Sequence, residues 1–499
     1  MPEENIRYAG FPSAVMYEQA VTGKSVKKKP VQHLLWGDWL TLKGGTKGDW
    51  LEVHARAENG WIHKDSIQTE RLLEITFVDI GQGDGCLIST PKDAHMLVDA
   101  GESDNMYRFL RWKFAGFDKE FKFESIIITH PDADHYFGFD RLFGDLPHLR
   151  FGTIYHNGIV ERNAKSKEEV LGRTGKDGKT KYLLEPVRDK DTLLSLLEKE
   201  ELIKKRQYAT MLKKALDTGR VDNISMLSAI DKYLPGYGPE NPISIEVLGP
   251  VPEPDMEGTP RLRWFGNVAK TKNGHSIILR LRYGRTSILL GGDLNIPAEH
   301  FLLSHYAGLE CPPKTSEIEN QLIESARRTF ESEVTKSCHH GSGDFTDLFL
   351  DAINPLATVI SSGDEESYSH PRSDALGAIG RHSRSGRPLI FSTELARSAK
   401  EIIKHPAILR EKAKELEKAV EEAKDEDAKK KAKAKYDEFV EKQFQRSIAV
   451  YGAINLRTDG NDVVIAQKIE SPRSKDKKWD IYVLKRDPSG VLRYEPESD

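Results

Sequence analysis

Short apolar runs that end in glycine or in charged residues recur through the middle of the chain. Ile126-Ile127-Ile128 leads into His130-Pro131-Asp132-Ala133-Asp134-His135, and the run from Thr286 to Leu290 leads into Gly291-Gly292-Asp293. The segment His95-Met96-Leu97-Val98-Asp99-Ala100-Gly101 likewise ends in aspartate and glycine. Apolar runs of this length, bounded by turn-forming residues, are typical of buried strands. The pattern predicts a sheet whose polar loops meet at one edge.

Histidine and aspartate are concentrated in these predicted loops. The first loop carries four potential metal ligands, and further histidines lie in Cys338-His339-His340-Gly341-Ser342 and in Ser367-Tyr368-Ser369-His370-Pro371. Imidazole and carboxylate groups are ligands that divalent cations take from proteins. A solvated turn would also explain Pro131 and Asp132. The recurrence of such loops along the chain favours a metal site.

Several segments, taken in order, resemble the metallo-β-lactamase superfamily and, more narrowly, the ComEC-type hydrolase domains of DNA-uptake proteins. They lie between about residues 73 and 395: Phe77–Gly85, Val98–Gly101, Thr129–His135, Asn273–Leu279, Leu290–Asp293, His339–Ser342 and Ser369–Pro371. The resemblance implies an α/β hydrolase fold, a four-layer αββα sandwich with metals at one edge of its two sheets.

The resemblance also implies metal-ligand roles for residues in these segments. They are His130 and Asp132 for a first ion, Asp134 and His135 for a second, Asp293 as the carboxylate that bridges both, and His339 as the last histidine, with His340 as its alternate. Asp99 resembles the carboxylate that orients a ligand histidine.

The sequence departs from the superfamily pattern at the histidine that many members place between the first loop and the bridging aspartate. Asp132 also stands where many members have a second histidine. His156 is the nearest candidate for the missing ligand, although its context matches no motif. His370 or water would otherwise complete the first site. Zinc is expected in these sites, with manganese as the alternative because oxygen-rich ligand sets favour it.

Two divalent cations about 3.5–4 Å apart can activate a shared hydroxide and neutralise charge on oxygen. The resemblance therefore implies a metal-dependent hydrolase, with phosphodiesterase or nuclease activity on DNA as the leading hypothesis. Asp134 is expected to be essential for catalysis, and His340 or His370 to protonate the leaving oxygen. The Gly341-Ser342 turn is expected to donate hydrogen bonds to phosphate.

Simpler structural roles compete with some of these assignments. A histidine before proline often only satisfies a loop carbonyl, so both roles stay open for His370. A hydrogen-bonded turn explains Asn273 and Ser276 better than catalysis does. The alternative functions are hydrolysis of a small molecule (a phosphocholine ester, nucleotide or lactone), or partner binding by a protein with a vestigial metal site. The intact set of candidate ligands argues against a vestigial site.

Composition adds limits to this picture. The chain has 499 residues, 30% charged and 38% hydrophobic, which fits a soluble protein of two or three domains with no membrane contact. Its three cysteines make no C-x-x-C pair and its first residues lack signal-peptide character, so a cytoplasmic location is expected. A net charge of −4 means that binding to DNA would need local positive patches.

The domain organisation is also predicted. Residues 15–70 have short aromatic-rich strands that resemble a bacterial Src-homology-3-like β-barrel, with at least two of Trp39, Trp50 and Trp61 expected in its core. The hydrolase domain is expected over residues 71–486. It has helical insertions at about 160–240, 295–332 and 400–445, the last of them a helical hairpin with an apolar seam.

The hairpin carries the run Lys429-Lys430-Lys431. Such a run is more often the solvated face of a helix than a nucleic-acid contact. The barrel and the hairpin are the expected places for a peptide or protein partner.

Overall fold

The computed structural model describes residues 5–22, 28–114, 117, 119–363, 369–394, 406–445, 448–494 and 496. Ser367 and Tyr368, predicted to share a turn with His370, lie outside the described residues, as does the first part of the predicted insertion at 400–445.

Two sheets form the centre of the molecule. The larger sheet contains, in spatial order, β15 (Val221–Met226), β12 (Leu149–His156), β11 (Phe121–Ile128), β10 (His95–Ala100), β9 (Gly85–Ser89), β8 (Leu73–Phe77), β24 (Ile454–Thr458), β25 (Val463–Lys468), β26 (Trp479–Arg486) and β27 (Leu492–Tyr494). The smaller contains β16 (Ile243–Gly249), β19 (Ile278–Tyr283), β20 (Thr286–Leu290), β21 (Val334–Lys336), β22 (Ala357–Ile360) and β23 (Leu389–Ser392).

Apolar side chains from both sheets pack face to face. Phe77, Ile127, Leu279 and Ile288 belong to this buried layer. Because both faces of the central strands are covered, these strands are continuous apolar runs rather than alternating ones. The strands next to the candidate loops are parallel, β10 with β11 and β20 with β21, so their carboxyl ends lie at the same edge.

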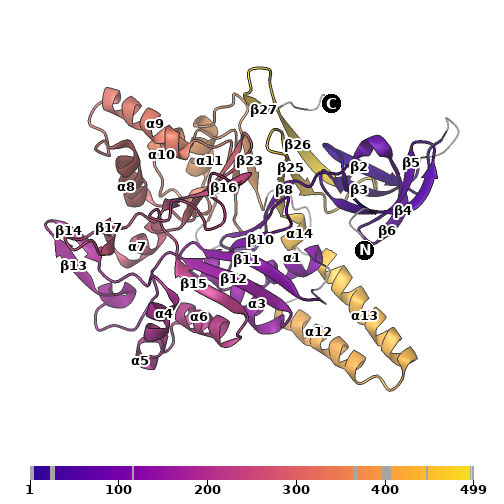
Figure 1. Cartoon of the computed structure of the whole chain (residues 1–499), viewed down its shortest axis with the longest axis horizontal. Helices are drawn as coiled ribbons and strands as arrows, with labels where there is room; N and C mark the ends of the chain where they lie inside the picture. Colours follow the sequence, from indigo (N-terminus) through magenta and orange to yellow (C-terminus); the bar gives the residue numbers. More distant parts are fainter. Residues whose placement is uncertain are drawn as a thin grey trace.

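Helices cover the outer face of each sheet. On the larger sheet lie α1 (Asn105–Lys113), α3 (Phe139–Asp145), α4 (Lys190–Leu197), α6 (Gln207–Asp217) and α14 (Ile448–Tyr451). On the smaller lie α8 (Ile296–Ala307), α9 (Ser316–Phe330) and α10 (Asp347–Ile353). The layers therefore follow the order αββα (Figure 1), and the predicted fold class is confirmed.

The N-terminal residues form a separate antiparallel sheet. Its order is β3 (Pro30–Leu35), β2 (Ser13–Tyr17), β6 (Glu58–His63), β5 (Trp50–Ala55), β4 (Trp39–Lys47), β1 (Ile6–Ala9) and β7 (Ile67–Gln68). The expectation that tryptophans fill its core is wrong, since the core is aliphatic, with Leu40, Val53 and Ile62 fully buried. Strand alternation turns Trp39 outward, where it is 52% exposed.

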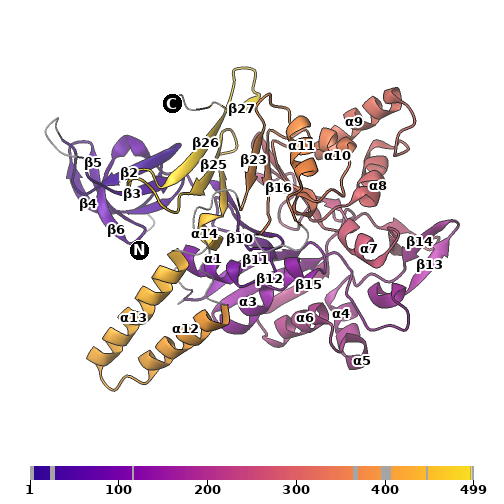
Figure 2. The same cartoon turned by 180° about the vertical axis from the view of Figure 1, so that it is seen from behind.

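Trp36, in contrast, is buried where the N-terminal sheet meets the larger sheet. It packs with Leu72, Val464 and Ala466, and both views show the N-terminal sheet beside β25 and β26 (Figure 2). Arg457 of β24, almost fully buried, donates to the Trp36 carbonyl at 2.6 Å and to Asp38 Oδ1 at 2.8 Å. The two parts are thus joined by a buried, charge-bearing contact.

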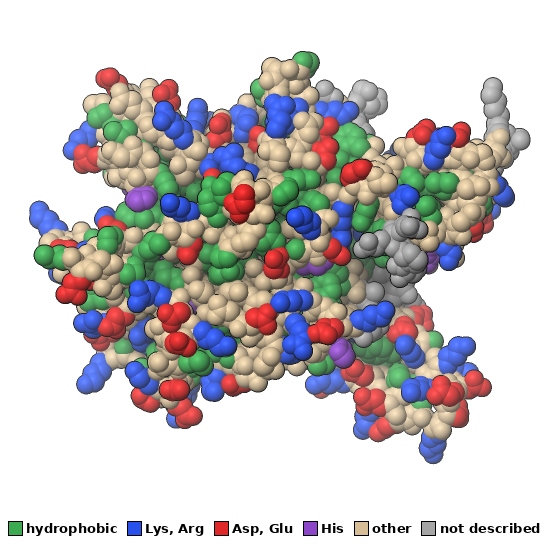
Figure 3. Space-filling view, viewed as in Figure 1, with side chains coloured by type: hydrophobic (Ala, Val, Ile, Leu, Met, Phe, Trp, Pro, Cys, Tyr) green, Lys and Arg blue, Asp and Glu red, His purple; other side chains and the backbone are tan. Residues whose placement is uncertain are grey.

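The helices α12 (Pro406–Glu421) and α13 (Glu426–Gln445) form a hairpin that projects from the body. Tyr436 of α13 accepts a hydrogen bond from Arg111 of α1 at 3.2 Å. Basic and acidic side chains are mixed along this hairpin (Figure 3), with 11 of each between residues 406 and 445. The hairpin as a whole therefore carries no net charge, although the run Lys429-Lys430-Lys431 lies within it. Within the described ranges, no helix combines the length and the apolar character needed to cross a bilayer.

Candidate metal centre

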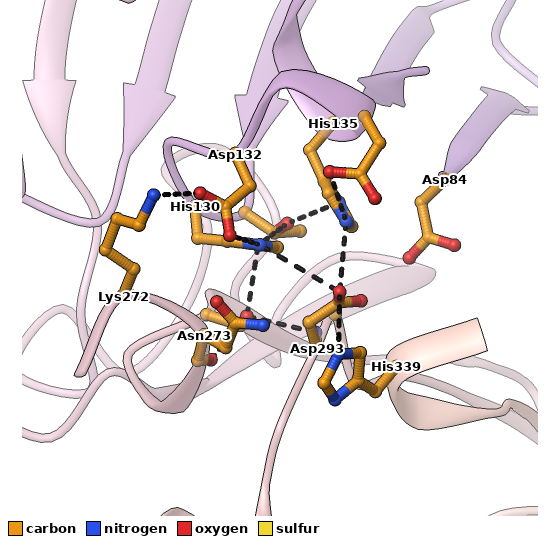
Figure 4. A network of polar contacts seen from close by, with 12 residues as sticks. Asp84, His130, Asp132, His135, Lys272, Asn273, Asp293 and His339 are labelled. Carbon is orange, nitrogen blue, oxygen red and sulfur yellow. Dashed lines mark hydrogen bonds and ion pairs between the residues drawn. The ribbon is translucent and has the colours of Figure 1, made fainter. Parts of the chain in front are cut away.

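The loops that follow β10, β11, β20 and β21 converge at one edge of the two sheets (Figure 4). Asp99 is the second-last residue of β10, and the loop after β11 leads into the short helix α2 (Ala133–Tyr136), which carries Asp134 and His135. Asp293 follows β20, and His340 lies in the turn η4 (Cys338–Gly341) after β21. The sequence pattern predicted this meeting of polar loops.

Asp134, His135, Asp293 and His340 each offer a ligand atom within 4.8 Å of the others, and we call them the Asp134 cluster. Asp293 Oδ2 lies at its centre, 3.3 Å from His135 Nε2 and 3.2 Å from His340 Nε2. Both Nε2 atoms and Asp293 Oδ1 are buried without a hydrogen-bond partner. Unpaired buried polar atoms are costly, so this set fits a divalent cation bound among them.

His135 is held so that one nitrogen faces the cluster. Its Nδ1 lies 2.8 Å from Asp99 Oδ2, which also accepts from the Thr129 hydroxyl at 2.7 Å. A carboxylate on one imidazole nitrogen fixes the ring and its tautomer, which leaves the other nitrogen as a ligand. Asp99 therefore stands in the place that the sequence analysis gave it, beside a candidate ligand histidine.

Replacing Asp99 with asparagine is expected to weaken metal binding by about 10–100-fold, the usual effect of losing such a supporting carboxylate. Asp99 has a left-handed backbone, with φ of 56°, and asparagine tolerates that conformation better than alanine does. Isothermal titration of metal-free protein with zinc or manganese measures the change. An affinity equal to that of the wild type would contradict the orienting role of Asp99.

The turn η4 brings His340, rather than its neighbour, into the cluster. His340 Nδ1 donates to the Ser361 carbonyl at 3.1 Å, which directs Nε2 toward Asp293. His339 Nε2 is 4.0 Å from Asp293 Oδ2, and its ring centroid is 5.9 Å from that of His370. Both His339 and His340 are left-handed, with φ of 49° and 54°. Such strain in consecutive non-glycine residues is typical of functional sites.

His130 and Asp132 lie beside the Asp134 cluster. His130 Nε2 is 3.6 Å from Asp132 Oδ2 and 4.0 Å from Asp293 Oδ2. Lys272, from the helix α7 (Val268–Gly274), forms an ion pair with Asp132, as the close-up shows. Neither His130 nor Asp132 belongs to a cluster of metal-ligand groups among the described residues.

The other candidate residues have local partners. His156 is buried at the end of β12, where its Nδ1 accepts from the Gly158 amide at 3.1 Å. The Ser342 hydroxyl accepts from the Asp344 amide at 3.3 Å. The Ser276 hydroxyl donates to the Asn273 carbonyl at 2.8 Å, which completes the predicted turn, and accepts from the Asp293 amide at 3.0 Å. Ser276 therefore helps to position the central aspartate.

Two buried charged residues of the site were not predicted. Asp84 forms an ion pair with Lys336 and lies 3.2 Å from His340 Nδ1. Lys336, the last residue of β21, also donates to the Gly292 carbonyl at 3.1 Å. The loop carrying Asp84 reaches the site because Gly83 lies against the Asp134 carbonyl, where a Cβ atom would be only 1.7 Å from that oxygen.

The charges of the site shift one another's pKa strongly. Burial acts to raise the pKa of Asp293, but His340 and His135 hold it well below its usual value. Burial acts to lower the pKa of His340, yet Asp293 and Asp84 raise it to about 10. For His370, burial lowers the pKa to about 4. In the cluster, carboxylate and imidazole charges thus depend on each other, as expected of groups arranged to surround a cation.

Comparison with known proteins identifies the family to which the chain belongs. The family model described as "Metallo-beta-lactamase superfamily" matches residues 79–331, about half of the chain. The chain belongs to the metallo-β-lactamase superfamily. The matched range includes most of the Asp134 cluster, and His340 lies just beyond it. Membership of this superfamily makes the chain a metal-dependent hydrolase by fold and by candidate ligands, with its substrate unspecified.

The chain is also similar to two curated proteins and to a solved structure. "Competence protein ComA" of Neisseria gonorrhoeae is 29% identical over 111 residues, which are 22% of this chain and 13% of that protein. "ComE operon protein 3" of Bacillus subtilis is 26% identical over 114 residues, 23% of this chain and 12% of that protein. The chain thus matches only a small part of these relatives. A solved structure titled as a metal-dependent hydrolase of the beta-lactamase superfamily is 13% identical, with a TM-score of 0.31, over 64% of this chain and 95% of that one.

Proposed function

We propose that the protein is a metal-dependent phosphodiesterase that cleaves DNA. The observation that carries this proposal is the Asp134 cluster, which is closed on one side and open on the other. The side chains of His135 and Asp293 are 0% and 4% exposed, whereas that of Asp134 is 19% exposed. A substrate oxygen can therefore approach the cluster from the Asp134 side.

The positions of the chain's own residues suit hydrolysis of a phosphodiester. A divalent ion bound in the cluster would lower the pKa of water and neutralise charge on a phosphate oxygen. His340 Nδ1 is engaged with the Ser361 carbonyl, whereas its Nε2 faces Asp293 without a hydrogen-bond partner, so His340 serves as a ligand in this proposal. His370 lies beside His339 at the same edge, but burial lowers its pKa to about 4, so in this proposal it is not assigned the role of proton donor to the leaving oxygen.

DNA is the proposed substrate for two reasons. The motifs of the chain resemble ComEC-type hydrolase domains, and the two similar curated proteins are named as a competence protein and a ComE operon protein. The hairpin, with its balanced charges, does not contribute to this assignment. In this proposal, contact with DNA occurs at the edge of the sheets that carries the cluster.

The protein is expected to hydrolyse bis(p-nitrophenyl) phosphate and to cleave DNA after metal-free protein is resupplied with manganese or zinc. The assay uses labelled single-stranded and double-stranded oligonucleotides, with a chelator-treated sample as the control. Cleavage of the small diester without cleavage of DNA would move the assignment to the small-molecule alternative. Absence of both activities in protein that has bound its metal would overturn the phosphodiesterase proposal.

A further inference from the structure

The carboxylate of Asp132 is already satisfied by protein groups. Oδ1 forms an ion pair with the ammonium of Lys272. Oδ2 is 3.0 Å from the amide nitrogen of Asn273, in the amide orientation that satisfies both ends of that side chain. The two donors are neighbours on α7 and approach the same carboxylate. A carboxylate with both oxygens engaged in this way has little capacity left for a metal ion.

Lys272 is itself part of a built, mostly buried arrangement. Its side chain is 13% exposed. Its Nζ forms ion pairs with Asp132 and, at 2.8 Å, with Glu161 Oε1. The α7 helix that carries it begins with a side-chain cap, in which Asn267 accepts from the Lys270 amide at 2.9 Å. The ammonium is thus held between two carboxylates by a short, anchored helix. A divalent ion could bind Asp132 Oδ1 only by displacing this ammonium.

His130 is part of no group of three or more ligand side chains, among the described residues, whose ligand atoms all lie close to one another. Its Nε2 is 3.6 Å from Asp132 Oδ2 and 4.0 Å from Asp293 Oδ2, too far for a hydrogen bond, and it is buried without a hydrogen-bond partner. By contrast, the Asp134 cluster brings two carboxylates and two imidazoles within 4.8 Å. Among the described residues, the Asp134 cluster is the larger of two groups with ligand atoms close enough to share an ion; the other, Asp84, Asp99 and His135, uses the same histidine, and neither group includes His130 or Asp132.

We infer that the centre holds a single divalent ion, in the Asp134 cluster, and that the Lys272 ammonium supplies the second positive charge, on the Asp132 side. The inference rests on the proposed function only for what that charge does, which is to stabilise a phosphate oxygen beside the ion. It departs from the two ions that the superfamily resemblance implies. It also gives a physical reason for the missing histidine, because a fixed lysine charge replaces an ion that would need it.

The number of ions per chain tests the inference without any substrate. Metal-free full-length protein is equilibrated with manganese or with zinc, separated from unbound metal, and analysed by plasma mass spectrometry. We expect about one ion per chain in the wild type and in Asp132→Asn, and close to none in His135→Ala. Two ions in the wild type, falling to one in Asp132→Asn, would overturn the inference even if the protein cleaves DNA.

Variants at Lys272 test whether its charge excludes the second ion. Lys272→Arg keeps the charge and is expected to bind one ion, whereas Lys272→Met is expected to gain a second, weaker ion at Asp132. Circular dichroism checks that each variant is folded. If Lys272→Met does not fold, the number of ions bound by Asp132→Asn tests whether a second ion binds at Asp132. A folded Lys272→Met protein that still binds a single ion would contradict the role given to the ammonium.

Discussion

Replacing Asp134 with alanine is expected to reduce metal-dependent hydrolysis by at least about 100-fold, because the ion that activates water loses a ligand on its open side. Asp134 is the most exposed member of its cluster, at 19% for the side chain. The two imidazoles nearest to it, His340 at 3.6 Å and His135 at 4.0 Å, both lie closer to Asp293, so the substitution is expected to leave the fold intact. Hydrolysis of the chromogenic diester, measured with metal content on the same sample, tests this result.

A matched variant separates the site effect from a general loss of aspartate. Asp145, at the end of the neighbouring helix α3, forms an exposed ion pair with Arg141 at 2.6 Å. Asp145→Ala is expected to retain full activity and metal content, since exposed pairs contribute little. Equal activity in Asp134→Ala and Asp145→Ala would show that the Asp134 cluster is not the site of hydrolysis.

The second large effect is expected at the junction between the N-terminal sheet and the larger sheet. Replacing Arg457 with methionine should lower the free energy of unfolding by about 3 kcal/mol, the low end for removing one partner of a buried ion pair. Arg457 contacts Asp38 and, at 3.4 Å, Glu74. The low end applies because each of these carboxylates keeps another cation at 2.8 Å, Arg56 on Asp38 and Lys113 on Glu74. Urea unfolding of wild type and variant, followed by circular dichroism, measures the difference.

Arg493 offers the control for this substitution, because it is an arginine of β27 that pairs with Asp487 while its side chain is 64% exposed. Arg493→Met is expected to change the unfolding free energy by less than about 1 kcal/mol. If Arg457→Met were as stable as Arg493→Met, the junction would not be held by its buried charges.

The fold and much of the site could be predicted from the sequence because both depend on local patterns. The run Ile126-Ile127-Ile128 and the loop after it are adjacent along the chain, so strand, loop and candidate ligands can be read together. The same holds for Asp293 after its strand. The positions of these side chains in space then follow from the parallel pairing of the strands.

The residues that were missed depend on distant partners. Lys272 contacts Asp132 from 140 positions along the chain, and Lys336 contacts Asp84 across two sheets. From sequence alone a lysine is expected at the surface. Its burial can be recognised only when the carboxylate that pairs with it is known. The prediction that tryptophans fill the core of the N-terminal sheet was wrong for a related reason. Alternation along a strand shows which residues share a face, but not which face the rest of the protein covers.

The pairing of β8 with β24 sets the order in which the protein can be completed during synthesis. Phe77 and Ile454 are partners in this pairing, although every residue of the Asp134 cluster lies between them in sequence. Until the ribosome has released β24, β8 is an open edge of the growing sheet, and such edges favour aggregation. Asp38 likewise cannot form its ion pair with Arg457 until that residue has been synthesised. We therefore expect nascent chains that end before residue 454 to depend on chaperones, however complete their candidate ligands are.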